Sequence, residues 1–137
     1  MNEKLRPGLS GSAELVVAEE HTAPRVGSGR VHVLATPVMI NLIEAAALVA
    51  VEHLLDPGYQ SLGTVLQVRH IAATPVGMRV RATAEVTKVE GRTLHFRVEA
   101  RDERDLIGDG THERMIVNVE RFDKRVQEKL ALLRGKT

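Results

Sequence analysis

The feature that most constrains this chain is a long apolar stretch, residues 35–55, with helix signals at both ends. Thr36 is predicted to cap the helix N-terminus, and Pro37 suits the first helical position because that position needs no N–H partner. Asp56-Pro57-Gly58 cannot continue a helix and ends it. Because apolar side chains point in every direction, we expect the rest of the protein to enclose this helix.

Two polar residues, Asn41 and Glu44, interrupt the apolar stretch. A membrane span needs about 20 mainly apolar residues, so the interrupted stretch predicts a core helix and no membrane association. A carboxylate on such a helix costs free energy unless it is paired, hydrogen-bonded or protonated. Glu44 is therefore the first candidate for a functional role.

The length of 137 residues fits one domain, residues 1–137. Aromatic residues make up only 2% and the net charge is +1, a composition that argues against nucleic-acid binding. The chain has no cysteine and no HxxxH or HxH spacing, so we expect no metal site. Residues 1–8 lack the apolar core of a secretion signal, which favours a cytoplasmic location.

Alternation of apolar and polar residues predicts five strands. They cover residues 10–18, 61–70, 78–87, 94–101 and 106–120. In the second strand, alternation places Leu62, Thr64, Leu66 and Val68 on one face and Gly63 on the other. Residues 19–30 are predicted to form a loop, 90–92 a hairpin turn, and 122–133 an amphipathic helix. Gly108 and Gly110 indicate a bulge near the start of the last strand.

One enclosed helix followed by a four-strand antiparallel meander allows few α+β architectures. The small sheet must wrap the helix, and its edges need covering. Edge-to-edge pairing in a homodimer, or in a dimer of dimers, would cover them and would form clefts shared by two subunits.

Several segments, in this order and spacing, resemble one known group of enzymes. They are Ala35-Thr36 followed eight residues on by Glu44, the run from Gly58 through Gly63-Thr64 to His70, and Ile107 to Arg114. The chain resembles the hotdog-fold acyl-CoA thioesterases and is most similar to the fluoroacetyl-CoA thioesterase family. This resemblance implies a curved antiparallel sheet wrapped around a long central helix, with a short C-terminal helix. It also implies hydrolysis of a small or short-chain acyl-CoA, with no cofactor apart from the coenzyme A of the substrate.

The resemblance also implies site residues. The family's catalytic threonine, glutamate and histidine fall on Thr36, Glu44 and His70, and two acyl-pocket residues fall on Gly63 and Arg114. The family enzyme has phenylalanines in a lid over the acyl group, whereas residues 19–30 contain none. Selectivity for a fluorinated acyl group is therefore not implied.

Thioester hydrolysis needs an activated nucleophile, a proton donor for the thiolate and positive potential at the carbonyl oxygen. We expect Glu44 to act as base or nucleophile, His70 as its proton partner, and Thr36 to position the carbonyl at the helix N-terminus. Eight helical residues rise roughly 12 Å, so Thr36 and Glu44 cannot touch within one straight helix.

Other interpretations remain open from the residues alone. Thr36 as an N-cap needs no catalytic role, and Glu44 can instead pair with an arginine across a dimer interface. A non-catalytic acyl-CoA-binding module and an enoyl thioester hydratase or dehydratase are the alternative functions.

Overall fold

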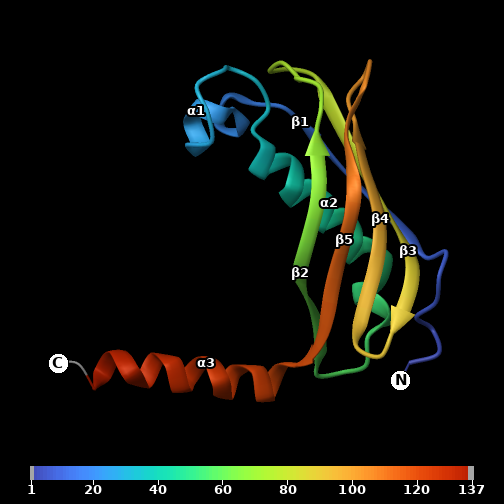
Figure 1. Ribbon diagram of the computed structural model, residues 1–137, viewed down its shortest axis with the longest axis vertical. Helices are drawn as coiled ribbons and strands as arrows, with labels where there is room; N and C mark the ends of the chain where they lie inside the picture. The colour runs from blue at the N-terminus through green and yellow to red at the C-terminus, as the bar shows by residue number, and fades with distance from the viewer. Residues whose placement is uncertain (1, 136–137) are drawn as a thin grey trace.

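A computed structural model describes residues 2–135 as a curved five-stranded antiparallel sheet wrapped around one helix, with a second helix of the same length at the C-terminal end (Figure 1). The elements are β1 (Ser10–Val16), η1 (Glu19–His21), α1 (Ala23–Val26), α2 (Thr36–Val51), η2 (Glu52–Leu54), β2 (Tyr59–His70), β3 (Arg79–Glu90), β4 (Thr93–Arg101), β5 (Leu106–Asn118) and α3 (Val119–Arg134). All five predicted strands are present, and residues 19–30, predicted as a loop, contain two short helical turns.

The strand order is β1-β3-β4-β5-β2. Only β3, β4 and β5 follow one another as a meander, because β2 pairs with β5 and β1 with β3. The predicted four-strand meander is therefore wrong in its placement of β2. Alternation reveals which residues share a face but not which strands are neighbours. As a result, β1 and β2 form the two edges of the sheet.

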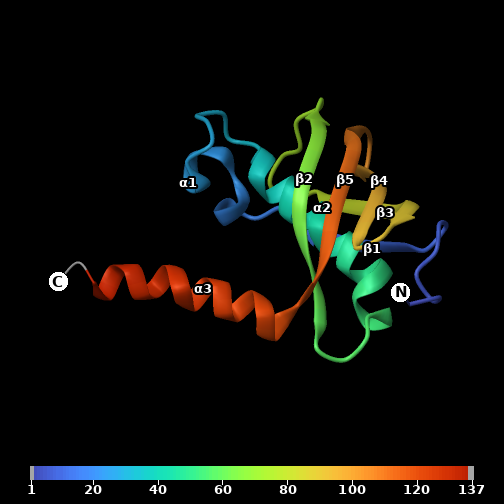
Figure 2. The same cartoon turned by 60° about the horizontal axis from the view of Figure 1, so that its bottom comes forward.

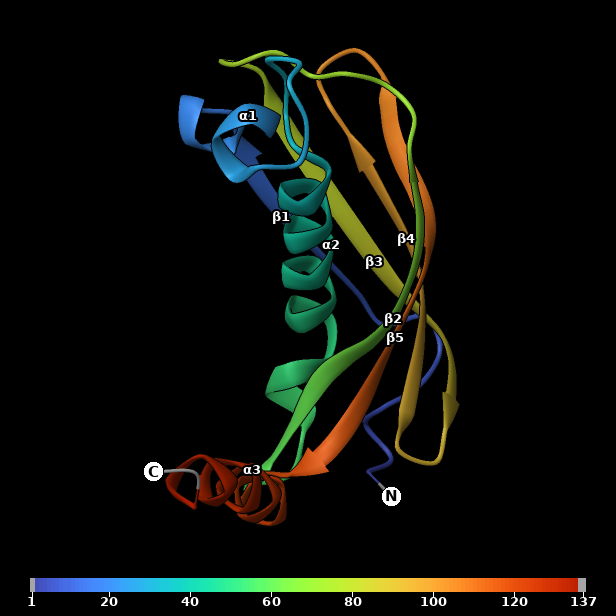
Figure 3. The same cartoon turned by 60° about the vertical axis from the view of Figure 1, so that its left-hand side comes forward.

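The curved sheet wraps one side of α2, as Figure 3 shows from the helix side. The buried face of α2 consists of Met39, Ile43, Ala46, Ala47, Ala50 and Val51. Gly11 of β1 brings its backbone directly against the helix, since a Cβ there would lie 2.5 Å from the Ala46 carbonyl oxygen. By length and hydropathy, Thr36–Leu54 would suit a membrane span, but in this fold it is the core helix.

In a single copy of the protein, α2 is not enclosed on all sides, so this expectation is wrong for the isolated chain. Leu48 is 37% exposed, and Val49, whose Cβ lies beside Gly11 of β1, is 55% exposed, because within residues 2–135 the sheet covers only part of the circumference of α2. The start of the helix also differs from the prediction. Ala35 is the N-cap residue, Thr36 is the first helical residue, and no side chain caps the helix. The Thr36 hydroxyl contacts His70 instead.

The strand β2 contains a bulge. Its register against β5 shifts between Gly63 and Val65, which leaves Thr64 as an extra residue. The prediction that Leu62, Thr64, Leu66 and Val68 share one face is therefore wrong, because the extra residue reverses the alternation. Leu66 and Val68 pack against the core, whereas Leu62 is exposed.

The strands β3 and β4 match their predicted faces. Their inward residues are all buried: Val80, Ala82, Ala84, Val86, Leu94, Phe96, Val98 and Ala100. The hairpin between them turns at Gly91, whose φ is 61°. The bulge predicted near Gly108 is confirmed, because the β4–β5 register skips Ile107.

The C-terminal helix is present but is not short, since α3 has 16 residues. It extends away from the sheet on the same side as β2 in Figures 1 and 2. Its apolar side chains are exposed to solvent in the single chain: Phe122, Val126, Leu130, Leu132 and Leu133.

Candidate active site

The first residue of α2 and the last residue of β2 meet at one end of the sheet. Thr36 Oγ1 lies 2.7 Å from His70 Nδ1, a hydrogen bond whose direction depends on the histidine tautomer. Burial lowers the pKa of His70, and the nearby Ala72 backbone opposes this shift. His70 is therefore neutral at pH 7. Its Nε2 is buried and has no hydrogen-bond partner within residues 2–135.

A cavity of about 420 Å³ opens beside this pair. It is lined by Thr36 and His70, by residues 71–73, and by residues from the segment between α1 and α2. Val31, Val33 and Leu34 supply the larger apolar side chains of that segment. The same segment also lines the cavity with Ser28 and Arg30, and residues 19–30 contain no phenylalanine.

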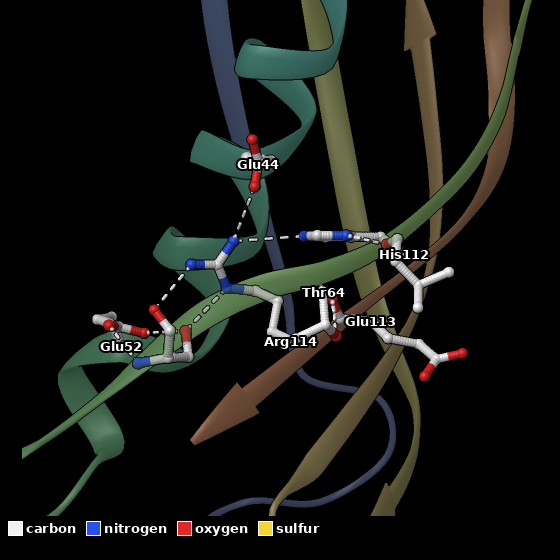
Figure 4. A network of polar contacts seen from close by, with 8 residues as sticks. Glu44, Glu52, Thr64, His112, Glu113 and Arg114 are labelled. Carbon is white, nitrogen blue, oxygen red and sulfur yellow. Dashed lines mark hydrogen bonds and ion pairs between the residues drawn. The ribbon is translucent and has the colours of Figure 1, made fainter. Parts of the chain in front are cut away.

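The predicted residues Glu44 of α2 and Arg114 of β5 form a second cluster farther along α2 (Figure 4), and Gly63 of β2 lies beside them. Arg114 Nη1 donates to Glu44 Oε2 at 3.5 Å, and the Glu44 side chain is 35% exposed while that of Arg114 is 5% exposed. Gly63 is the register partner of Arg114. A Cβ at Gly63 would clash with Glu44 Oε2 and would lie 3.2 Å from His112 Cε1. Glycine thus makes room for the Glu44 carboxylate.

Three residues of this cluster were missed from the sequence: Glu52, Ser61 and His112. Ser61 accepts two hydrogen bonds from Arg114, one to its hydroxyl at 2.8 Å and one to its carbonyl at 3.0 Å. Glu52 accepts from the Ser61 backbone N–H at 2.9 Å and from its hydroxyl at 2.6 Å. His112 was predictable, because residues 112 and 114 share one face of a strand. No comparable periodicity links Glu52 to Ser61.

His112 is buried and neutral. Burial is the main cause that lowers its pKa, and the nearby Arg114 cation lowers it further. Its Nδ1 lies 2.8 Å from the Val65 carbonyl oxygen, which can only accept, so the ring proton is on Nδ1. The lone pair of Nε2 then accepts from Arg114 Nη1 at 3.3 Å.

The predicted catalytic residues therefore fall into two groups within one chain. Thr36 and His70 are together, and Glu44 lies with Gly63 and Arg114. Within residues 2–135 no hydrogen bond or ion pair joins Glu44 to His70, in keeping with the roughly 12 Å rise of the helix between residues 36 and 44. In the same part of the chain, no group of three or more His, Asp or Glu residues is placed to hold a metal ion.

Comparisons with known proteins identify the family of this chain. Residues 17–120 match the family model of fluoroacetyl-CoA-specific thioesterases. The fluoroacetyl-CoA thioesterase of Streptantibioticus cattleyicolor is 48% identical over 97 residues, which cover 71% of this chain and 70% of that protein.

Solved structures point the same way. A structure of the fluoroacetyl-CoA thioesterase has 40% identity and a TM-score of 0.86, covering 91% of this chain and 97% of that one. A Thermus thermophilus hypothetical protein of the thioesterase superfamily has 34% identity and a TM-score of 0.83, covering 93% and 96%. The chain therefore belongs to the fluoroacetyl-CoA-specific thioesterase family, which confirms the hotdog fold and the thioester hydrolase activity that its sequence implied.

Proposed function

We propose that this protein hydrolyses coenzyme A thioesters of small or short-chain acyl groups to the acid and free coenzyme A. The observation that carries this proposal is the 2.7 Å contact between Thr36 and His70 at the start of α2, beside a cavity of about 420 Å³. The first N–H groups of a helix have no intrahelical partner and carry partial positive charge. In α2, Pro37 has no N–H and the N–H groups of Val38 and Met39 bond to the Ala35 carbonyl, so a thioester carbonyl in this cavity would meet the partial positive charge of the helix start.

The roles of the three catalytic residues depend on which ring nitrogen of His70 carries the proton, and this mechanism assigns it to Nδ1. With the ring proton on Nδ1, His70 donates to Thr36 Oγ1, and the Thr36 hydroxyl is free to donate to the thioester carbonyl oxygen. As a base, Glu44 removes a proton from the attacking water, and the unpartnered Nε2 of His70 takes up that proton and passes it to the leaving thiolate. As a nucleophile, Glu44 attacks the carbonyl carbon and the thiolate leaves and takes a proton from solvent. Water deprotonated by His70 Nε2 then hydrolyses the acyl–glutamyl anhydride, which releases the acid and restores Glu44. Gly63 and Arg114 border the acyl group.

We propose that the protein acts as a homodimer through the free edge of β2. Antiparallel pairing of two β2 edges, with the two-fold axis between Leu66 and Gln67, sets residue 70 of one copy opposite residue 63 of the other. The Thr36–His70 pair of one copy would then face Glu44 of the second copy across one cleft. The uncovered face of α2 and the row of unpaired β2 backbone groups support this arrangement.

The central test is release of free thiol from acetyl-CoA by the purified protein and by Glu44→Gln. Because the chain has no cysteine, a thiol reagent reports only the coenzyme A that is set free. We expect turnover by the wild-type protein and none by the variant, with unchanged circular dichroism. Equal turnover by Glu44→Gln would refute the role of Glu44. Binding without thiol release, or water addition to an enoyl-CoA, would favour the binding-module or hydratase alternative.

The shared cleft has its own test, which mixes two inactive variants. His70→Ala and Glu44→Gln, unfolded together and refolded as a mixture, form heterodimers in which one of the two clefts contains both intact halves. We expect about a quarter of wild-type activity, because half of the dimers are mixed and each has one working cleft. Refolding each variant alone is the control. No recovery of activity in a mixture shown to contain heterodimers would place the whole site within one chain.

The cytoplasmic location stays a prediction.

A further inference from the structure

Arg114 is held by more partners than an acyl-pocket residue requires. Its guanidinium is almost fully buried, and burial lowers its pKa while Glu52 and Glu44 oppose that shift. Four of its N–H contacts are accounted for: two to Ser61, one to His112 and one to Glu44. Within residues 2–135 no hydrogen bond or ion pair joins Glu52 to Arg114, so Glu52 acts on the guanidinium through its charge and through hydrogen bonds that Ser61 relays.

The Ser61 hydroxyl connects the two charged groups. It donates its only proton to Glu52 Oε1, so its lone pairs are left to accept from Arg114 Nε. Glu52 Oε2 fixes the Ser61 backbone N–H, and the Ser61 carbonyl accepts from Arg114 Nη2. A single carboxylate thus orients both acceptor groups that Ser61 presents to the guanidinium. The neutral His112 ring, stacked on Phe96, closes the other side.

We propose that Glu52, acting through Ser61, is a positioning residue that fixes the Arg114 guanidinium so that Nη1 faces Glu44 and the cleft. This inference rests on the proposed function, because it assigns how the Glu44–Arg114 half of the site is held in place. Glu52 lies at the first residue of η2, eight residues after Glu44, where the helical run continues from α2. The end of the core helix therefore controls the geometry of a residue on β5.

An isosteric change separates this role from simple packing. In Glu52→Gln, the amide has one oxygen that accepts and one nitrogen that only donates. The amide oxygen can accept from the Ser61 N–H, but the amide nitrogen cannot accept the Ser61 hydroxyl proton and instead donates to Ser61 Oγ. The glutamine then competes with Arg114 Nε for the lone pairs of Ser61 Oγ, which weakens the hold on the guanidinium. Loss of a hydrogen bond to a charged group corresponds to about a tenfold effect. We expect kcat/KM for acetyl-CoA to fall about tenfold.

The decisive measurement is a double-mutant cycle with Arg114→Gln. We expect Arg114→Gln to reduce kcat/KM at least as much as Glu52→Gln, and the double variant to equal Arg114→Gln. A merely structural role of Glu52 would instead give a double variant whose loss is the product of the two single losses. That result, or wild-type kcat/KM in Glu52→Gln, would overturn the inference. If Arg114→Gln fails to fold by circular dichroism, Arg114→Lys takes its place, because lysine cannot form the forked contact with Ser61.

The control variant is Glu128→Gln, which removes a carboxylate from the exposed surface of α3. It should leave kcat/KM unchanged. The two proposals fail in different ways. A wild-type protein that releases no thiol overturns the proposed function, whereas a wild-type protein that turns over, with multiplicative losses in the cycle, overturns only the positioning role of Glu52.

Discussion

The substitution Gly63→Ala tests whether the cluster around Glu44 depends on the absence of a side chain. The new Cβ would clash with Glu44 Oε2 and would lie 3.5 Å from Arg114 Nη1. Gly63 does not have a positive φ, so alanine introduces no backbone strain at this position. Any effect of Gly63→Ala on activity or stability therefore comes from the space that the new methyl group takes beside the Glu44 carboxylate.

Its magnitude can be worked out from the geometry. To reach an ordinary contact distance, the Glu44 carboxylate must move by roughly 1 Å, and misplacement by that amount costs on the order of 100-fold in rate. The Arg114–Glu44 contact is already long at 3.5 Å and would not survive such a shift. Glu44 is partly exposed and can turn into the cleft, so the free energy of unfolding should fall by no more than about 1 kcal/mol. That loss corresponds to a decrease in Tm of about 4 °C.

The assay is kcat/KM for acetyl-CoA by thiol release, together with Tm from circular dichroism. Gly135→Ala is the matched control, because the nearest atom to its new Cβ would be 3.7 Å away and the site is at the end of α3. We expect a loss of about 100-fold for Gly63→Ala and none for the control. Wild-type kcat/KM in Gly63→Ala, or a fall in Tm large enough to explain the lost activity, would refute the close-approach argument.

Three further predictions concern protonation and packing. Burial lowers the pKa of His70, and the mechanism needs the neutral ring. As the pH is lowered, kcat/KM should therefore begin to fall only below the ordinary histidine pKa of 6.5. A fall in kcat/KM with its midpoint above pH 6.5 would contradict this. Burial also lowers the pKa of His112 in the folded chain. Below pH 6.5 the unfolded chain therefore binds more protons than the folded chain, and the free energy of unfolding should fall as the pH decreases below 6.5. Urea unfolding at about pH 7.5 and 5.5 should show a smaller fall in His112→Gln. Gly11→Ala should lower the free energy of unfolding by about 1–3 kcal/mol in urea unfolding, because its Cβ would press against the Ala46 carbonyl oxygen. An unchanged free energy of unfolding would mean that β1 can move away from α2 without cost.

Much of the fold could be predicted because alternation is a strong signal on half-buried strands. The apolar residues of β3 and β4 are buried as expected, and the hairpin at Gly91 joins them. Strand neighbours could not be predicted in the same way. Nothing in the pattern of β2 distinguishes pairing with β5 from pairing with β3, because either choice buries the same face. The proposal of one domain is supported by the single core cluster around α2.

The candidate site could be predicted in part. Glu44 stood out as an acid on an apolar helix, and its pairing with Arg114 explains how the charge is tolerated. Thr36 was harder to interpret, since a threonine before a proline fits a helix cap; in the structure its hydroxyl contacts His70 while Ala35 takes the cap position. The contacts of Glu52 and Ser61 could not be inferred, because they join residues that no sequence period relates.

The bulge in β2 explains how one strand can serve both halves of the site. In a regular strand, residues 63 and 70 are separated by an odd number of positions and point to opposite faces. The extra residue Thr64 reverses the alternation between them. Gly63 therefore faces Glu44 and His70 faces Thr36, both on the side of α2. A strand without this irregularity would turn one of the two groups to the outer surface of the sheet, and no pairing of two copies along β2 could then bring the halves into one cleft.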